Sequence, residues 1–131
     1  MIEDWQWISK DEVVAIHRKQ IERYGGLSGI RDEGLLESAI ARPRNLFAYE
    51  NVDNPIALAA AYAFGLARNH PFADGNKRSA FVVSVLFLDL CGLAVETSQK
   101  NVIDTVLALA SGDLTEEEFA DWLRGVTVPK E

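Results

Sequence analysis

Two long apolar segments constrain the fold of this chain more than any other feature of its sequence. Residues 56–69 (IALAAAYAFGLARN) and 80–90 (AFVVSVLFLDL) are apolar on nearly every side when they are placed on a helix. A helix that is apolar all round has to be buried by other elements. The second segment is also too short to span a bilayer. We therefore expect two central helices that pack together, with the polar residues between them at their shared end.

Capping signals predict four further helices around these two. The first is expected to end at residues 24–26 (YGG) and the second at Pro43, because proline disfavours a helical conformation in the residue before it. Residues 44–53 (RNLFAYENVD) are then expected to form a loop or flap. Asn54 is followed by proline, which is favoured at the first helical position. Polar residues at the start of apolar periodicity give the predicted N-caps, which are Ser9, Asp32, Asn54, Ser98 and Thr115.

These elements predict an all-α fold, a compact domain of about six helices. No segment shows sustained strand alternation, although residues 93–95 could form a short extended connector. A chain of 131 residues is most simply one domain, spanning residues 1–131, and can bury about two thirds of its unfolded surface.

Charge and cysteine content limit the function classes. The net charge is −7 and the sequence pI is about 4.8, so direct binding to nucleic acid or to a membrane surface is not expected. The lone Cys91 excludes an internal disulfide framework, and residues 1–10 lack a secretory signal pattern. We expect a cytoplasmic protein in which any anion site is local.

The loop between the two apolar segments, residues 69–79 (NHPFADGNKRS), concentrates the chemistry of the chain. Pro71 places His70 at a helix exit. Gly75 allows backbone amides to approach a ligand, and the helix that begins near Asn76 directs free N–H groups and the positive end of its dipole into the loop. The sequence therefore predicts an anion site.

Further charged residues suit this site to phosphate. Lys77 and Arg78 stand in the first helical turn, where a cation is unfavourable unless an anion is present. Arg68 can add N–H donors for phosphate oxygens, and Asp74 can hold magnesium. His70 can then accept the proton of an attacking hydroxyl, which indicates phosphoryl or nucleotidyl transfer.

Each residue of the loop, taken alone, also has a structural explanation. A polar loop with an Asp-Gly-Asn turn often has no chemical role, and it is the number of such groups in one loop that favours function. His17 has the helical spacing of Val14 and Ile21, so partial burial is expected rather than catalysis. Cys91 is expected to be a small core residue. P-loop, dinucleotide-binding, protein-kinase and zinc-site signatures are absent from the sequence.

Residues 70–78 (HPFADGNKR) resemble the Fic family motif H-x-F-x-[D/E]-G-N-x-R, in its Doc (death-on-curing) toxin form. The similarity extends over residues 23–29 (RYGGLSG), 48–50 (AYE) and 86–88 (LFL), and covers nearly the whole chain. The resemblance implies a Fic-type helical fold, a toxin of a toxin–antitoxin pair that arrests growth, and ATP and magnesium as ligands. It also implies translation elongation factor Tu as the protein target.

The resemblance implies a role for each motif residue. His70 would be the general base on a target hydroxyl, Asp74 the magnesium ligand and Phe72 the anchor of the loop in the core. Phosphate binding would fall to Gly75 and to residues 76–78, and Arg68 would help to neutralise transferred charge. The catalytic set is thus His70, Asp74, Arg68, Lys77 and Arg78, and the phosphate-binding set is Gly75, Asn76, Lys77 and Arg78.

Two departures from the family motif bear on the reaction. Fic proteins that transfer AMP mostly have glycine at the position of Lys77 and arginine at that of Phe81, whereas the Doc-type form has the lysine and transfers the terminal phosphate. Gly75, however, matches the AMP-transferring pattern. A lysine adds bulk and charge where glycine would admit phosphates against the backbone, so we favour a Fic-type protein kinase. The alternatives are an AMP transferase and a non-catalytic helical interaction module.

The resemblance also bears on regulation. Fic proteins are commonly restrained by an inhibitory helix with the pattern [S/T]-x-x-x-E-[G/N]. The nearest approaches here fail, because Ser28 lies five residues before Glu33 and Leu46 occupies the hydroxyl position before Glu50. We therefore expect a separate cognate antitoxin whose segment folds against the domain and covers the active site.

Overall fold

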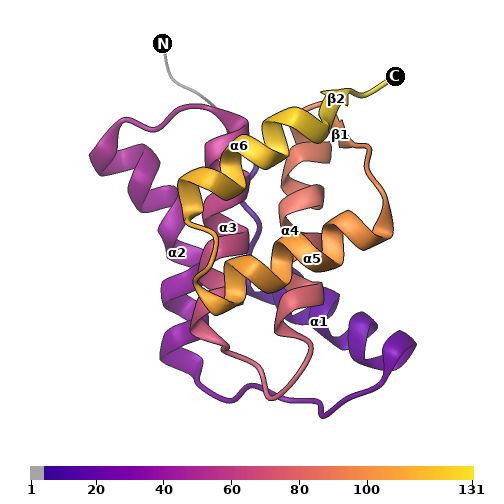
Figure 1. Ribbon diagram of the computed structural model, residues 1–131. Coiled ribbons are helices and arrows are strands. Elements are labelled where there is room, and N and C mark those ends of the chain that lie inside the picture. The colour runs from indigo at the N-terminus through magenta and orange to yellow at the C-terminus, as the bar shows by residue number, and fades with distance from the viewer. Residues whose placement is uncertain (1–4) are drawn as a thin grey trace.

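The computed structural model describes residues 5–131, and this part of the chain contains six helices and one small sheet (Figure 1). The elements in chain order are α1 (Lys10–Tyr24), α2 (Glu33–Glu50), α3 (Pro55–Asn69), α4 (Asn76–Leu90), β1 (Leu93–Val95), α5 (Gln99–Ser111), α6 (Glu116–Val126) and β2 (Thr127–Pro129). The all-α prediction is confirmed.

Helix α3 lies at the centre of the fold, as its all-round apolar sequence predicts. It packs against α2, α4, α5 and α6, and nine of its residues are buried. Gly65 lets α2 approach α3 closely, since a Cβ atom at this position would lie 3.0 Å from the Cα of Ala39. Helix α4 packs along α3 and against α1, so the two apolar segments form the core together.

The predicted N-caps are confirmed at all five positions. Side chains of Asp32, Asn54 and Ser98 accept hydrogen bonds from the third helical N–H, and Ser9 and Thr115 form full capping boxes with Glu12 and Glu118. Helix α1 ends at Tyr24, followed by Gly25, as expected.

The predicted end of the second helix at Pro43 is wrong, and so is the loop predicted for residues 44–53. Pro43 lies buried inside α2, which continues to Glu50 and ends at Asn51 in the left-handed conformation. Proline removes the helical hydrogen bond to the carbonyl of Ala39, but packing of α2 along α3 holds the helix together at that point. Only residues 51–54 form the connection to α3.

The extended connector at residues 93–95 is confirmed and forms β1. It pairs antiparallel with β2, with Ala94 opposite Val128, and this second strand was not predicted. The pair lies at the opposite end of the molecule from the α3–α4 loop (Figure 1). Among the described residues, no helix is both long enough and apolar enough to cross a membrane.

Candidate active site

His70 ends α3 in the left-handed conformation, with φ 48° and ψ 55°, and is exposed. Such a backbone costs about 1–3 kcal/mol in a residue other than glycine, so it needs support from its surroundings. Arg31 supplies it: its Nε donates to the carbonyl oxygen of His70 at 2.7 Å, and its Nη2 donates to that of Asn69 at 2.9 Å. These bonds give the last carbonyl groups of α3 their hydrogen-bond donors. The His70 imidazole is not needed for this.

The segment before α2 runs antiparallel to the loop and holds it through backbone bonds. The N–H groups of Arg31 and Asp32 donate to the carbonyl of Pro71 at 2.7 and 3.0 Å, and the N–H of Ala73 donates to the carbonyl of Gly29 at 3.0 Å. Ile30 and Phe72 form an antiparallel bridge between the two segments. The loop is therefore fixed along its first half.

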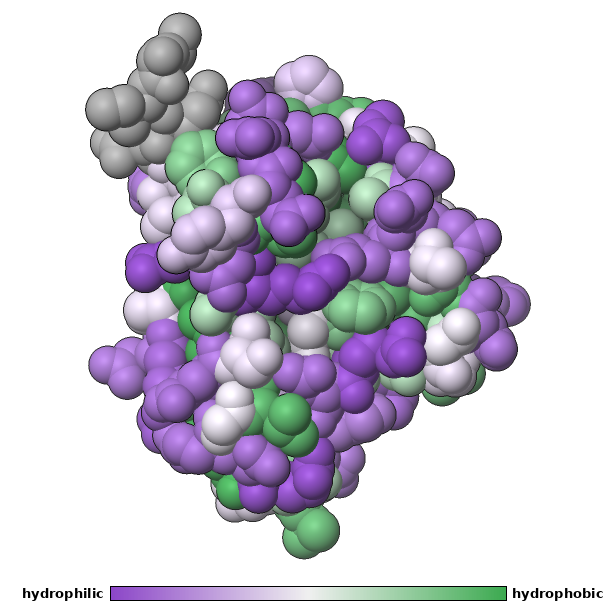
Figure 2. All heavy atoms as spheres, turned by 90° about the vertical axis from the view of Figure 1, so that its left-hand side faces the viewer, coloured by the Kyte–Doolittle hydropathy of each residue, from purple (hydrophilic) through white to green (hydrophobic). Residues whose placement is uncertain are grey.

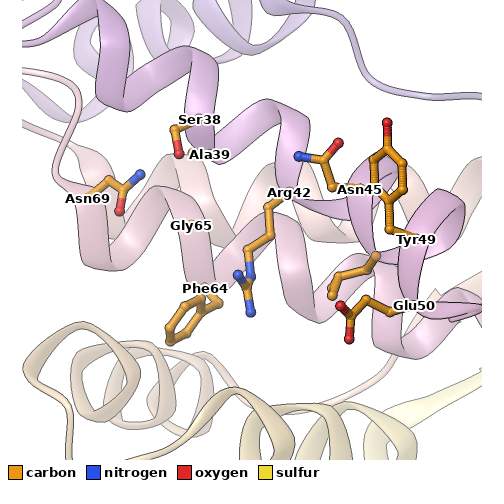
Figure 3. A pocket seen from close by; sticks show the side chains of 10 residues that line it. Ser38, Ala39, Arg42, Asn45, Tyr49, Glu50, Phe64, Gly65 and Asn69 are labelled. Atoms are coloured by element: carbon orange, nitrogen blue, oxygen red, sulfur yellow. The ribbon is translucent and has the colours of Figure 1, made fainter.

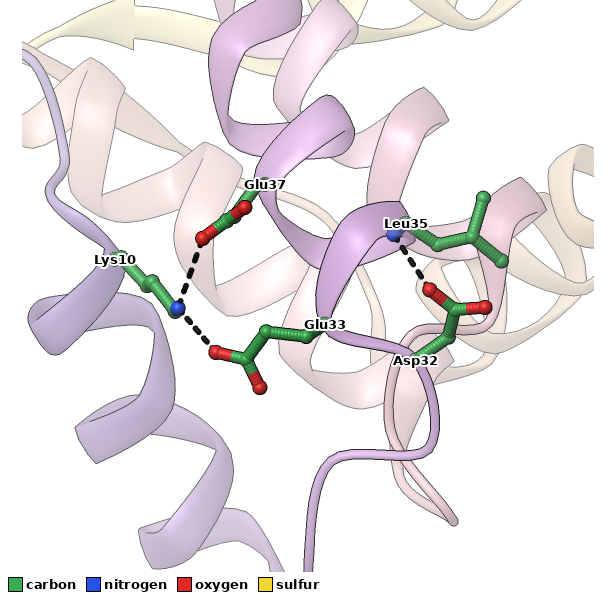
Figure 4. A network of polar contacts seen from close by, with 5 residues as sticks. All are labelled: Lys10, Asp32, Glu33, Leu35 and Glu37. Atoms are coloured by element: carbon green, nitrogen blue, oxygen red, sulfur yellow. Dashed lines mark hydrogen bonds and ion pairs between the residues drawn. The ribbon is translucent and has the colours of Figure 1, made fainter.

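Asp32 connects this support to the helices (Figure 4). Its carboxylate caps α2 at the N–H of Leu35, and Lys10 at the start of α1 forms ion pairs with Glu33 and Glu37. Both carboxylates are more than half exposed, so solvent screens these ion pairs and they contribute little to stability. The contacts set the position of α2 relative to α1 more than they stabilise the fold.

Phe72 anchors the loop in the core, where it is 1% exposed. The side chain of Asn76 closes the loop above it: Oδ1 accepts from the N–H of Phe72 at 2.9 Å, and Nδ2 donates to the carbonyl of Phe72 at 3.0 Å. Asn76 was predicted to bind phosphate. These two bonds use Oδ1 and one hydrogen of Nδ2, so the backbone N–H and the second Nδ2 hydrogen are the donors left for an anion.

His17 of α1 lies beneath the loop. Its ring stacks on Phe72 with 3.8 Å between the centroids, and its Nε2 lies 2.7 Å from the carbonyl oxygen of Asp74. The side chain is 3% exposed, which is deeper than the partial burial expected from the sequence. Burial, the largest cause, lowers the pKa of His17; the hydrogen bond to the Asp74 carbonyl opposes this shift and the nearby Arg78 adds to it. Because a carbonyl oxygen can only accept, Nε2 carries a proton and donates it to this bond.

The Asp74 carboxylate stands at the exposed side of the loop. Its Oδ1 accepts from the N–H of Gly75 at 2.9 Å and its Oδ2 from the N–H of Leu27 at 3.3 Å. These two bonds, with the positive charges of residues 77 and 78, lower the pKa of Asp74 and keep it ionised.

A magnesium ion fits this single carboxylate. Residues 5–131 contain no group of three or more His, Cys, Asp or Glu side chains that could hold a metal by themselves. Magnesium, however, is commonly held by one or two carboxylates together with substrate phosphates and water. Asp74 would be the protein ligand of such an ion.

Helix α4 begins differently from the other helices that the structure describes. Its N-cap is Gly75, in the left-handed conformation with φ 74°, and no side chain caps its first N–H groups. The first turn contains Lys77 and Arg78 and no acidic residue. Uncapped N–H groups, the helix dipole and two cations together make a site for an anion such as phosphate.

The predicted phosphate-binding cations do not all lie together. The Arg78 Nη2 donates to the carbonyl of Gly25 at 3.1 Å, and its guanidinium lies 5.3 Å from the centre of the Tyr24 ring. Lys77 is exposed on the same turn. Arg68, in contrast, lies over the ring of Phe64, on the side of α3 that faces the connection between α5 and α6.

A hollow of about 400 Å³ is lined by residues of α2 and α3 (Figure 3). Arg42 enters it, pairs with Glu116 and lies 4.9 Å from the ring centre of Phe64. Its rim reaches Asn69 but none of residues 70–78. The face of the molecule on the α2 side is mostly hydrophilic, with apolar residues in separate small patches (Figure 2).

Two supporting residues were missed by reasoning from the sequence. His17 was predicted to be partly buried, and its contact with the loop was not predicted. Arg31 was not singled out at all; its position directly before the N-cap Asp32 was the only signal. Both bind carbonyl groups of the loop rather than its side chains.

The fold and this site define a class of helical domain, in which a loop with an exposed histidine leads into an uncapped helix N-terminus suited to phosphate. Residues 7–88 match the sequence profile of the Fic/DOC family, and the chain belongs to this family.

Two relatives are similar over most of their length. The chain is 38% identical to "Protein kinase doc" of Escherichia phage P1 over 117 residues, which are 89% of this chain and 92% of that protein. It is 34% identical over 105 residues to "Toxin Doc" of Mycolicibacterium smegmatis, covering 78% of this chain and 81% of that one.

Proposed function

We propose that this protein is the toxin of a toxin–antitoxin pair and acts as a phosphotransferase that moves the γ-phosphate of ATP to a hydroxyl of a protein. One observation carries the proposal: the loop that starts at the exposed His70 leads into α4, which begins without a side-chain cap and has Lys77 and Arg78 in its first turn. The names of the two relatives, one a kinase and one a toxin, support it.

The geometry of the loop supports a role for each of these residues. The N–H groups at the start of α4 and the Lys77 ammonium would bind the phosphates. Magnesium at Asp74 would supply positive charge that offsets the charge of the phosphates. The target hydroxyl attacks the γ-phosphorus, its proton passes to His70, and the bond to the β–γ bridging oxygen breaks, so that ADP leaves.

The proposed target is translation elongation factor Tu, and growth arrest would follow from its modification. This proposal is tested by incubating purified elongation factor Tu with the protein, ATP and magnesium, and measuring its mass. Addition of one phosphate supports the proposal. The His70→Ala protein is the control: it should retain native helicity by circular dichroism, because His70 is exposed, and leave the target unmodified, because the base is missing.

An AMP transferase is the second candidate, because Gly75 matches the pattern of Fic proteins that transfer AMP. Labelled ATP separates the two reactions. If the γ-phosphate is transferred, label at that position appears on the target and label at the α position does not. Transfer of the α label would overturn the kinase assignment. Absence of ATP binding in isothermal titration would instead favour a non-catalytic interaction module.

The partner proposed for this chain is a separate antitoxin that covers the active site. The absence of the inhibitory pattern from the sequence supports this, as does the name of the relative "Toxin Doc". Expression of the wild-type chain alone should arrest growth of a susceptible host, and co-expression of the antitoxin should relieve it. Harmless expression at a high level would contradict the proposal.

A further inference from the structure

His17 contacts the loop at the one peptide that links the candidate metal ligand to the start of α4. It comes from α1, 57 residues earlier in the chain, and its Nε2 donates to the carbonyl of Asp74 at 2.7 Å. The ring is held in place by its stack on Phe72, in which the two planes differ by 4°. A buried donor with a fixed ring plane can point in only one direction.

That contact fixes the peptide group between Asp74 and Gly75. In a trans peptide the carbonyl and the N–H point in opposite directions, so an anchor on the carbonyl also sets the direction of the N–H. The N–H in question is that of Gly75, which donates to Asp74 Oδ1 at 2.9 Å. His17 thus acts on the Asp74 carboxylate through one rigid plane.

The packing beneath Gly75 supports the same link. A Cβ atom at Gly75 would lie 3.2 Å from Cδ1 of Ile21 and 3.6 Å from Cδ2 of His17. The peptide therefore rests directly on α1. The carboxylate itself remains exposed above it, where a ligand can reach it.

We propose that His17 is a positioning residue: its hydrogen bond to the Asp74 carbonyl holds the Asp74 carboxylate in the orientation that binds magnesium with ATP. The inference rests on the proposed function, which supplies magnesium and ATP as the ligands. The His17 contact itself is present in the protein without any ligand. Loss of partners that orient a metal ligand typically lowers metal affinity by about 10- to 100-fold.

Two substitutions separate positioning from simple packing. His17→Gln keeps an N–H donor near the place of Nε2 but loses the aromatic stack. His17→Phe keeps a ring against Phe72 but loses the donor. Val13→Ala is the control, because Val13 is buried one turn earlier on α1, with no hydrogen bond from its side chain to the loop.

The first measurement is the dissociation constant for ATP by isothermal titration, with magnesium and with EDTA, well below the melting temperature of each protein. The gain in affinity from magnesium should fall about tenfold in His17→Phe. It should stay within about threefold of wild type in His17→Gln and be unchanged in Val13→Ala. A gain that falls equally in Val13→Ala and His17→Phe, or in neither, would overturn the inference.

The second measurement needs no ligand. Hydrogen exchange by NMR should show the Gly75 amide protected in wild type, Val13→Ala and His17→Gln, and exposed in His17→Phe. If wild type binds no ATP with magnesium, the proposed function fails, and the Gly75 amide still decides the role of His17. Equal protection of that amide in all four proteins would refute positioning.

Discussion

Substitution of Gly26 tests the candidate metal ligand without changing any residue of the motif. A Cβ atom at Gly26 would lie 2.7 Å from Oδ2 of Asp74, closer than such contacts allow. That oxygen accepts the N–H of Leu27, so it cannot stay in place when the methyl group is present. In Gly26→Ala the carboxylate must turn away from the α1–α2 connection.

We expect Gly26→Ala to lower the stability of the fold moderately and the magnesium-dependent affinity for ATP strongly. Alanine at Gly26, with φ 116°, costs about 1–3 kcal/mol of unfolding free energy through backbone strain. The clash adds little to this, because a short exposed side chain can rotate. The ligand geometry, in contrast, is lost, and the contribution of magnesium to ATP affinity should fall about 10- to 100-fold.

Gly29→Ala is the matched control. Its φ is 109°, so it bears similar backbone strain, but no heavy atom lies within 4 Å of the added Cβ. Urea unfolding should give the two variants free energies within about 0.5 kcal/mol of each other. Titration with ATP and magnesium should show the loss in Gly26→Ala alone. Equal magnesium dependence in the two variants would refute the placement of the Asp74 carboxylate as the metal ligand.

Three further substitutions test the core. Tyr62→Phe leaves the buried N–H of Ile8 without its 2.8 Å acceptor, which should cost about 1–3 kcal/mol in urea unfolding. Burial raises the pKa of Tyr62 to about 12, so this advantage of wild type should decrease as the pH rises from about 10 to 12, where only the unfolded state ionises. Ser79→Ala removes a buried hydroxyl with no partner among residues 5–131 and should leave the unfolding free energy equal or higher. Gly65→Ala gains about 1 kcal/mol in helix propensity but forces a methyl group against Ala39, so we expect a net loss of about 1 kcal/mol.

The helix starts could be predicted from the sequence because capping is a local interaction. Each predicted N-cap accepts a hydrogen bond from the N–H three residues later, so the contact depends only on a segment of four consecutive residues. The buried position of α3 follows from its composition alone, because apolar residues lie on nearly every face of this helix. Both kinds of signal are contained within one element.

The end of α2 could not be predicted in this way. A proline inside a helical pattern usually ends or kinks the helix, and the rule failed at Pro43 because the helix continues along α3, where Leu46 and Phe47 are partly buried. That packing depends on residues of another element. Strand β2 was missed for the same reason, as three residues become a strand only through their pairing with β1.

The contacts that hold the active-site loop could not be predicted from the sequence, although the loop motif itself could be recognised. His17 and Arg31 lie 57 and 39 residues from the carbonyl groups they bind, and Asn76 holds both backbone groups of Phe72. A contact to a backbone atom can form with any residue type in the loop. The loop sequence therefore does not indicate that His17 and Arg31, elsewhere in the chain, bind it. The loop is held by its backbone atoms and not by the side chains that would do the chemistry. The His70 imidazole and the Lys77 ammonium are therefore not needed for its conformation, and both residues are exposed.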